Sequence, residues 1–263
     1  FNGMQYVRGH ATDYDHWAQL GNRGWSYSDV LPYFKKSEAF YGGGSEFHGV
    51  DGPLPVTKQP ENNPLSQAFV EACREAGHPR NDDFNGATQD GFGFFDFNIR
   101  DGRRVTTAQS HLYPALRRPN LSLMSSALTD RIVFADGAAR GVEVLRAGRR
   151  QTITARREVI LSAGAINTPQ ILLRSGIGPG DHLRAFGIDV RADVPGVGKN
   201  FQDHINVGIG YKAREPVSIV GSLRLDRLVG EMLRGILLRK GPVARSVLEA
   251  GGLFRNPPGA DAP

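Results

Sequence analysis

The sequence predicts an α/β fold (with α+β elements) that combines helices with both antiparallel and parallel strands. Three observations predict it. Helix-start signals stand at residues 26–29 and again at 63–64. Residues 121–155 alternate short apolar runs with turn residues, as in an antiparallel meander. Residues 157–173 place a continuous apolar run before a Gly/Ala turn and a helical pattern, the order of a doubly wound α/β unit.

Composition narrows the class of protein. The 263 residues suffice for one large or two small domains, and 40% hydrophobic with 22% charged residues is ordinary for a globular chain. No apolar run reaches the roughly 18 residues of a membrane-spanning helix. The net charge of +5 is scattered, whereas a nucleic-acid surface shows a clustered stripe, so no nucleic-acid partner is expected. The lone Cys73, read as a small buried residue, fits a reducing compartment. A cytoplasmic location is expected, with peripheral membrane association kept open.

The first half of the chain contains two predicted helices. Ser26 followed by Asp29 is a capping-box pattern, which predicts a helix from there onward. Residues 42–63 are rich in Gly, Pro and Asn and are predicted to be loop. Asn63-Pro64 then combines an N-cap residue with proline at the first helical position, and Gly77 closes this second helix.

The middle of the chain changes character. Residues 79–104 are predicted to be loop and short strand, and residues 105–117 to be helix. A meander of three or four antiparallel strands follows, in which Asp136-Gly137 is a strong hairpin-turn signal. The expected strands are Leu121–Met124, Arg131–Phe134, Val142–Leu145 and Gln151–Ala155.

The unit after the meander is the best local indication of a ligand site. Val159–Leu161 is continuously apolar, as in a strand buried on both faces. The small residues of Ala163–Asn167 form the predicted turn, Thr168-Pro169 opens the next helix, and Gly176 ends it. Small residues let a ligand approach the backbone, and the positive end of the helix favours an anion. Such turns also serve packing alone, so both interpretations stay open on these residues.

Other local signals are weak. The fingerprint G-x-G-x-x-G after a strand is absent, and Gly196-Val197-Gly198 is predicted to be a turn. No metal-binding motif occurs, the seven histidines are dispersed, and no G-x-S-x-G nucleophile elbow is found. Local chemistry alone therefore reaches only an α/β domain with a candidate nucleotide site.

Longer stretches resemble one family. Gly164–Gly178 is similar, position by position, to the second signature of the glucose-methanol-choline (GMC) oxidoreductases. Asn2–Gly9 resembles the end of the first signature. The resemblance extends to about Arg255 and is strongest to choline dehydrogenases and related bacterial FAD-dependent alcohol dehydrogenases. Further matching stretches are 13–17, 24–34, 104–108, 112–115, 118–121, 195–198, 200–204, 241–242 and 249–254.

The resemblance implies a two-domain flavoprotein. Residues 1–41 and 100–208 would form part of a Rossmann-like FAD-binding domain that includes the meander. Residues 42–99 and 209–263 would supply loops and part of an antiparallel-sheet substrate domain. The implied reaction moves a hydride from a primary alcohol, possibly choline-like, to flavin N5 while a base removes the hydroxyl proton. A quinone, a carrier or oxygen would accept the electrons.

The resemblance also implies individual roles. Thr129 stands where valine is usual, at a position whose backbone meets the adenine of FAD. Glu249 lies on the substrate side, where a carboxylate could attract a cationic alcohol, and a structural salt bridge is the alternative. No metal ligand and no catalytic residue is assigned. The expected cofactor-binding residues are Asn2, Gly3, Met4, Gln5, Thr129, Ala163 and Gly164.

Two family features are expected outside this sequence. The dinucleotide fingerprint would precede Phe1, and the catalytic histidine would follow Pro263. General base catalysis needs that group, so the chain alone is expected to be inactive. The alternatives are a truncated, non-catalytic flavin-fold binding protein, a GMC oxidase, or a cyanohydrin lyase on the same scaffold.

Overall fold

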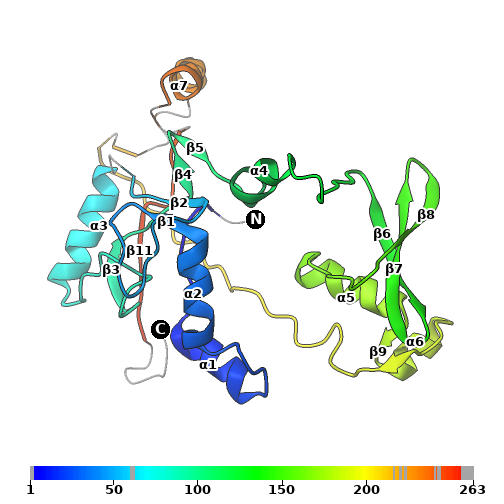
Figure 1. The fold of residues 1–263 in the computed structure, drawn as a ribbon. Helices are drawn as coiled ribbons and strands as arrows, with labels where there is room; N and C mark the ends of the chain where they lie inside the picture. Colours follow the sequence, from blue (N-terminus) through cyan, green and yellow to red (C-terminus); the bar gives the residue numbers. More distant parts are fainter. Residues whose placement is uncertain are drawn as a thin grey trace. The chain divides into compact units, whose positions relative to one another are not determined.

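The chain folds into two compact units, seen in a computed structural model. Unit 1 comprises Phe1–Leu121 with Tyr211–Pro263, and unit 2 comprises Ser122–Gly210 (Figure 1). Residues 1–41 therefore share a unit with 42–99. The predicted division into cofactor and substrate domains concerns function and stays a prediction. The structure describes residues 3–59, 63–215, 217–218, 221, 224–239, 241 and 244–255.

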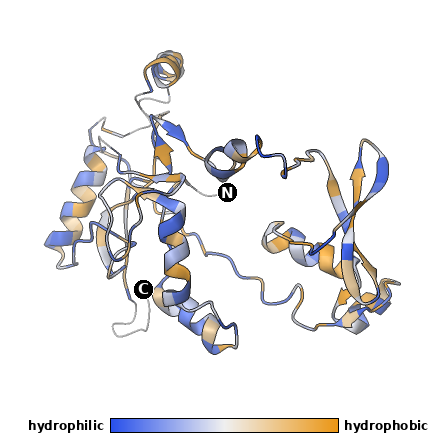
Figure 2. Ribbon diagram, in the orientation of Figure 1, coloured by the Kyte–Doolittle hydropathy of each residue, from blue (hydrophilic) through white to orange (hydrophobic). Residues whose placement is uncertain are grey.

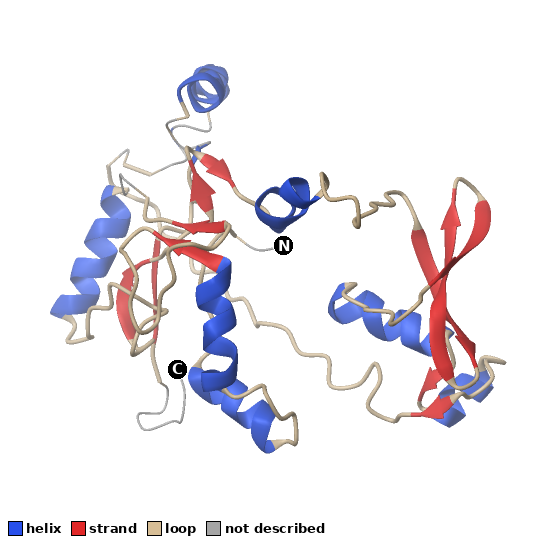
Figure 3. Ribbon diagram, viewed as in Figure 1, coloured by secondary structure: helices blue, strands red, loops and turns tan. Residues whose placement is uncertain are grey.

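Unit 1 contains short sheets and several helices joined by long loops (Figure 3). β1 and β2 pair in parallel, whereas β3–β11 and β4–β5 are antiparallel. Its strands are β1 (Glu38–Phe40), β2 (Leu54–Val56), β3 (Gly91–Phe94), β4 (Ile99–Arg100), β5 (Arg103–Arg104) and β11 (Ala250–Leu253). Its helices are α1 (Ala11–Gln19), α2 (Tyr27–Ser37), α3 (Pro64–Glu75), α4 (Tyr113–Ala115) and α7 (Leu225–Leu238).

The predicted helix starts are confirmed. Ser26 caps α2: its Oγ accepts from the Asp29 N–H at 3.3 Å, and the Asp29 carboxylate accepts from the Ser26 N–H at 3.1 Å. At α3, the Asn63 Oδ1 accepts from the Leu65 N–H at 2.9 Å. Apolar and polar residues share the surface of α3 (Figure 2), and its Val70 is buried.

The helix predicted over 105–117 is shorter and irregular. A π-helix spans Ala108–Leu112 and runs directly into α4. Pro114 explains the difference, because proline has no N–H and its ring crowds the carbonyl one turn earlier. The wider π turn relieves that crowding.

Unit 2 is built on the predicted meander. β6 (Leu128–Ala135), β7 (Ala138–Arg146) and β8 (Arg149–Thr154) form an antiparallel sheet in that order. Asp136 and Gly137 both have positive φ, at 52° and 73°, as a tight hairpin turn requires. The strand expected at Leu121–Met124 is wrong: the segment is loop, because no strand among the described residues lies beside it to share backbone hydrogen bonds.

The segment before α5 (Gly164–Arg174) also differs from expectation. The predicted buried strand around Val159–Leu161 is extended loop, and the Ile160 side chain is 76% exposed. A doubly buried strand needs a parallel neighbour on each side, and the described residues provide none. The helix begins at Gly164 rather than Thr168, so the predicted turn forms its first coil. The helix end at Gly176 is confirmed, with φ at +83°.

A buried hydroxyl helps to join the end of α5 to the sheet. Ser175, which follows the last residue of α5, donates from Oγ to the Ile171 carbonyl at 2.6 Å and accepts from the Ile132 N–H of β6 at 2.8 Å. Beyond it, β9 (Ile177–Gly178) pairs in parallel with β10 (Ala192–Asp193) around α6 (Gly180–Ala185). In the described part of the chain, no helix has the length and apolar character to cross a bilayer.

Ser175→Ala is expected to lower the free energy of unfolding of unit 2 by about 1–3 kcal/mol, because the buried Ile132 N–H loses its acceptor. Amide hydrogen exchange over β6 measures this directly. Ser125→Ala, at an exposed loop position of the same unit, is the matched control. Unchanged protection of β6 in Ser175→Ala would show that the hydroxyl carries no net stabilisation.

Candidate cofactor-binding site

The segment beginning at Gly3 is held along both of its edges. On one edge, the Met4 carbonyl accepts from the Asn98 N–H at 2.9 Å, and Gln5 forms a β-bridge with Phe97. On the other edge, the Gln5 Nε2 donates to the Leu248 carbonyl at 3.0 Å. Met4 has φ at +73°, an uncommon conformation for a residue with a side chain. These contacts pin Gly3, Met4 and Gln5 in one backbone path. Asn2 lies outside the described residues.

A buried ion cluster continues this anchoring. An Nη of Arg8 lies 2.7 Å from the Glu38 Oε1, and the His48 Nδ1 lies 3.0 Å from the same oxygen. The other ring nitrogen of His48 lies 3.0 Å from Asp83. Burial, followed by the Glu38 charge, raises the pKa of Tyr6 to about 12. Sequence reasoning missed this cluster, because Glu38 follows two lysines and resembles part of an exposed charged run.

Asp96 forms a second buried ion pair beneath the same segment. Its side chain is 2% exposed, its carboxylate lies 3.2 Å from the Lys58 Nζ, and its backbone carbonyl accepts from the Tyr6 N–H. Desolvation raises the pKa of Asp96 to about 6, and the Lys58 charge opposes that shift. Lys58 also donates to the Phe94 carbonyl at 2.7 Å.

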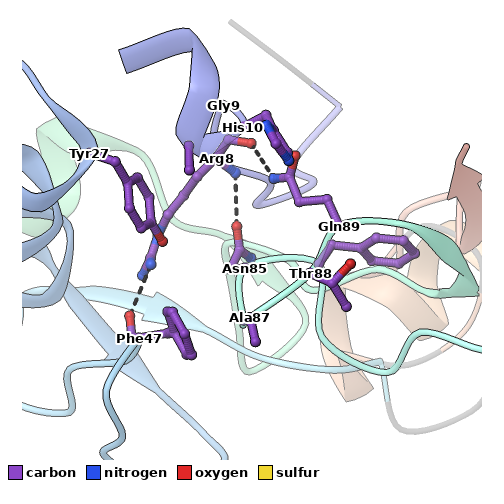
Figure 4. A pocket seen from close by; sticks show the side chains of 12 residues that line it. Arg8, Gly9, His10, Tyr27, Phe47, Asn85, Ala87, Thr88 and Gln89 are labelled. Atoms are coloured by element: carbon purple, nitrogen blue, oxygen red, sulfur yellow. Dashed lines mark hydrogen bonds between the residues drawn. The ribbon is translucent and has the colours of Figure 1, made fainter. Parts of the chain in front are cut away.

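A small cavity lies where Arg8 meets the loop at residues 84–89. The Arg8 N–H donates to the Asn85 Oδ1 at 2.8 Å, and the Gln89 Nε2 donates to the Arg8 carbonyl at 2.9 Å (Figure 4). The cavity volume is about 60 Å³. Ligand pockets occupy about 300–1,000 Å³, so this space suits water molecules and not a flavin. We regard it as a structural junction.

In unit 2, Ala163 and Gly164 lie exposed at the start of α5. Gly164 has φ at +89°, and a Cβ added there would meet nothing within 4 Å. The Ala163 N–H donates to the Thr168 Oγ1 at 3.0 Å, but no side chain caps the helix. The first-turn N–H groups therefore face open space at the positive end of the helix dipole, which suits an anion such as a pyrophosphate.

A larger hollow lies beside this helix start. Its volume is about 970 Å³, enough for a cofactor-sized ligand. Apolar side chains dominate its lining, which includes Ala165 and Leu172 of α5 and Phe201 from the loop at 196–202. Thr129 does not line it. Thr129 lies half-buried in β6 opposite Val144, and its adenine contact stays a prediction.

The Glu249 carboxylate accepts a hydrogen bond at the start of α3. The donor is the Asn63 N–H at 2.6 Å, at the residue that caps α3, and Glu249 is 7% exposed. This arrangement suits the structural alternative, although the partner is a backbone N–H rather than a cation. The substrate role stays a prediction.

Each unit, considered by itself, has one feature that would suit part of a flavin dinucleotide. In unit 1, a pinned backbone runs from Gly3 to Gln5, the segment expected against the ring. In unit 2, an uncapped helix start with small residues offers N–H donors beside an apolar hollow. The feature in unit 2 suits a charged diphosphate next to an apolar group.

Known proteins resemble this chain along its whole length. A family model described as GMC oxidoreductase matches residues 1–206. An oxygen-dependent choline dehydrogenase of Sinorhizobium fredii is 44% identical over 262 residues, covering 100% of this chain and 48% of that protein. One of Brucella ovis is 45% identical over 263 residues, with the same coverage. The chain thus spans about half the length of these curated relatives.

Solved structures of flavin-dependent oxidases and oxidoreductases also resemble this chain. An FAD-dependent oxidoreductase from Chaetomium thermophilum matches with a TM-score of 0.84 and 28% identity, covering 96% of this chain and 47% of that one. Pyridoxine 4-oxidase from Mesorbium loti matches with a TM-score of 0.70 and 38% identity, covering 74% of this chain and 38% of that one. The formate oxidase of Aspergillus oryzae matches with a TM-score of 0.84 and 26% identity, covering 97% of this chain and 46% of that one.

Asp96→Asn is expected to flatten the pH dependence of stability. A carboxyl whose pKa rises on folding binds its proton more tightly in the folded state, so wild-type stability falls as the pH rises from about 4 to about 6. The shift from 3.8 to about 6 corresponds to about 3 kcal/mol. Calorimetric melting between those pH values and above should show this loss in the wild type and not in the variant.

Asp82→Asn, at an exposed neighbour that pairs with Arg80, is the control and should retain the wild-type slope. Equal slopes in wild type and Asp96→Asn would show that Asp96 ionises normally in the fold.

Proposed function

Because this chain belongs to the GMC oxidoreductase family, we propose that it forms part of an FAD-dependent enzyme that oxidises a primary alcohol, choline-like in structure. The observation that carries the proposal is the identity of 44–45% to choline dehydrogenases over the entire chain. The formate and pyridoxine oxidases share the fold with lower coverage or identity, so they support the chemistry of the family more than a choice of substrate.

In this proposal the chain holds FAD with backbone rather than charge. Ala163, Gly164 and the N–H groups after them would bind the adenosine and diphosphate part, with Thr129 at the adenine. Gly3, Met4 and Gln5, with Asn2 before them, would lie against the flavin ring. The contacts to Asn98 and Leu248 would keep that segment from moving when substrate binds. Bound FAD supplies the acceptor for the substrate hydride.

Proton removal is assigned to no residue of this chain. The electron acceptor is proposed to be oxygen, a quinone or a carrier, and the oxidase neighbours favour oxygen as one of these. Inactivity of the chain alone stays a prediction. The proposed location is the cytoplasm, in line with the single free Cys73, with peripheral membrane association kept open.

Ala165→Asp is expected to weaken FAD binding at least about tenfold, a loss of about 1.4 kcal/mol. The new carboxylate would face the hollow beside α5 and repel the diphosphate. An acidic residue in the first turn of a helix is itself favourable, so the helix should not be weakened. Titration of FAD, followed by flavin fluorescence and visible absorbance, measures the change.

The isosteric Ala165→Asn is the control and should bind FAD nearly as the wild type does. The proposal of an FAD contact at α5 would fail if Ala165→Asp bound FAD as tightly as Ala165→Asn.

Glu249→Gln separates the two roles open to Glu249. A glutamine still accepts from the Asn63 N–H but carries no charge. If the carboxylate attracts a cationic alcohol, the KM of the active holoenzyme for choline should rise about tenfold or more, while the KM for its uncharged analogue 3,3-dimethylbutanol should not. Equal KM changes for the two alcohols, or none, would leave Glu249 as an anchor of α3 alone.

A further inference from the structure

A polar cavity in unit 2 lies among arginines from several elements. Its volume is about 440 Å³, and it is lined by Arg131 of β6, Arg174 of α5 and Arg191, which precedes β10. Ile132, Ser175, Gly176 and residues Gly187–Asp189 complete the wall. None of the described residues predicted to contact the cofactor lines this cavity. It lies at the end of α5, whereas Ala163 and Gly164 lie at its start.

The buried carboxylate beside this cavity already accepts hydrogen bonds from three arginines. Asp130 accepts from Arg131 twice, at 3.2 Å each, from Arg150 at 2.7 Å, and from Arg174. A carboxylate offers about four lone-pair sites, and each guanidinium brings five N–H donors. Arg131 and Arg174 therefore each keep N–H donors that do not reach Asp130. Both side chains are about half exposed, so their remaining donors are reachable from solvent.

Arg191 adds a third guanidinium that is held without a carboxylate. Its guanidinium carbon, Cζ, lies 5.2 Å from the centre of the Phe134 ring, in a cation–π contact. No ion pair of Arg191 occurs within the part of the chain that the structure describes. The aromatic face orients the guanidinium without consuming its N–H donors.

An ion-pair network that only stabilises the fold explains part of this arrangement. A cation at the end of a helix is favourable, which accounts for Arg174 and its pairing with Asp130. It does not account for Arg191 or for the cavity that the three arginines share. The charged residues that line the cavity are Arg131, Arg174, Arg191 and Asp189, and Asp130 beside it pairs with Arg131 and Arg174. The site retains a positive charge.

We propose that this cavity binds a phosphate-bearing anion, either free phosphate or a phosphomonoester. Guanidinium groups bind phosphate oxygens through paired, charge-assisted hydrogen bonds. The cavity is far larger than a halide and falls in the range of small-ligand pockets. The bound anion would accept the donors that Asp130 leaves over.

The test is a titration of the full chain with inorganic phosphate at constant ionic strength, followed by calorimetry. We expect saturable one-to-one binding with a Kd of about 1 mM or tighter. Arg191→Gln should weaken it about tenfold, as expected for the loss of charged hydrogen bonds. Arg191→Lys should lose part of the affinity, because lysine keeps the positive charge but not the paired N–H donors of the guanidinium. Arg184→Gln removes an exposed arginine of α6 that pairs with Asp181, and it should bind phosphate as the wild type does.

Parallel titrations identify the source of the phosphate. Glycerol phosphate tests a soluble monoester, and vesicles of phosphatidic acid in phosphatidylcholine test a lipid headgroup; either response supports the proposal if Arg191→Gln removes it. Absence of saturable binding would overturn it, as would equal losses in Arg191→Gln and Arg184→Gln. Stoichiometric displacement of phosphate by FAD would also overturn it, because the cavity would then belong to the cofactor. Circular dichroism of each variant confirms that the fold is retained.

Discussion

The carboxylate of Glu38 lies in the interior of unit 1 with no exposed surface, where an unpaired charge would cost several kcal/mol. One oxygen satisfies that demand by meeting Arg8, His48 and the Gly49 N–H. Arg8 belongs to the N-terminal segment, and His48 and Gly49 belong to the loop before β2, so one charge ties the end of α2 to both. His48 extends the tie to Asp83. Removal of the Arg8 side chain would leave the Glu38 charge buried without its guanidinium partner, which is more costly than the loss of an ordinary contact.

The close packing around Glu38 requires glycine at two positions. The chain around Glu38 is so close to the next loop that a Cβ at Gly49 would lie 1.9 Å from the Lys35 carbonyl oxygen, and one at Gly52 would lie 2.3 Å from the Glu38 nitrogen. No side chain fits there without moving α2 or β1. The segment proposed to lie against the flavin ring thus depends on residues 30 or more positions away that are not among the predicted cofactor-binding residues.

Features that depend on interactions between residues close in sequence were predicted correctly, whereas features that depend on distant residues were not. The caps at Ser26 and Asn63 and the hairpin at Asp136-Gly137 depend on neighbours within a few residues, and all were predictable. The strand expected near Val159 depends on partners from elsewhere in a sheet, and its apolar run alone did not produce one. The Glu38 cluster was missed for the same reason, since its partners are distant in sequence. The predicted cofactor residues came from resemblance; the structure adds that Gly3–Gln5 are pinned and that α5 starts earlier than its proline suggested.

The division into two units has a spectroscopic consequence. Both tryptophans, Trp17 and Trp25, and all seven tyrosines lie in unit 1, whereas the aromatic residues of unit 2 are phenylalanines alone. Near-ultraviolet absorbance and intrinsic fluorescence therefore report on unit 1 and are silent about the sheet β6–β8. Backbone circular dichroism detects both units. A comparison of the two signals during unfolding would show whether the units melt as one cooperative body or one after the other, without any label being added.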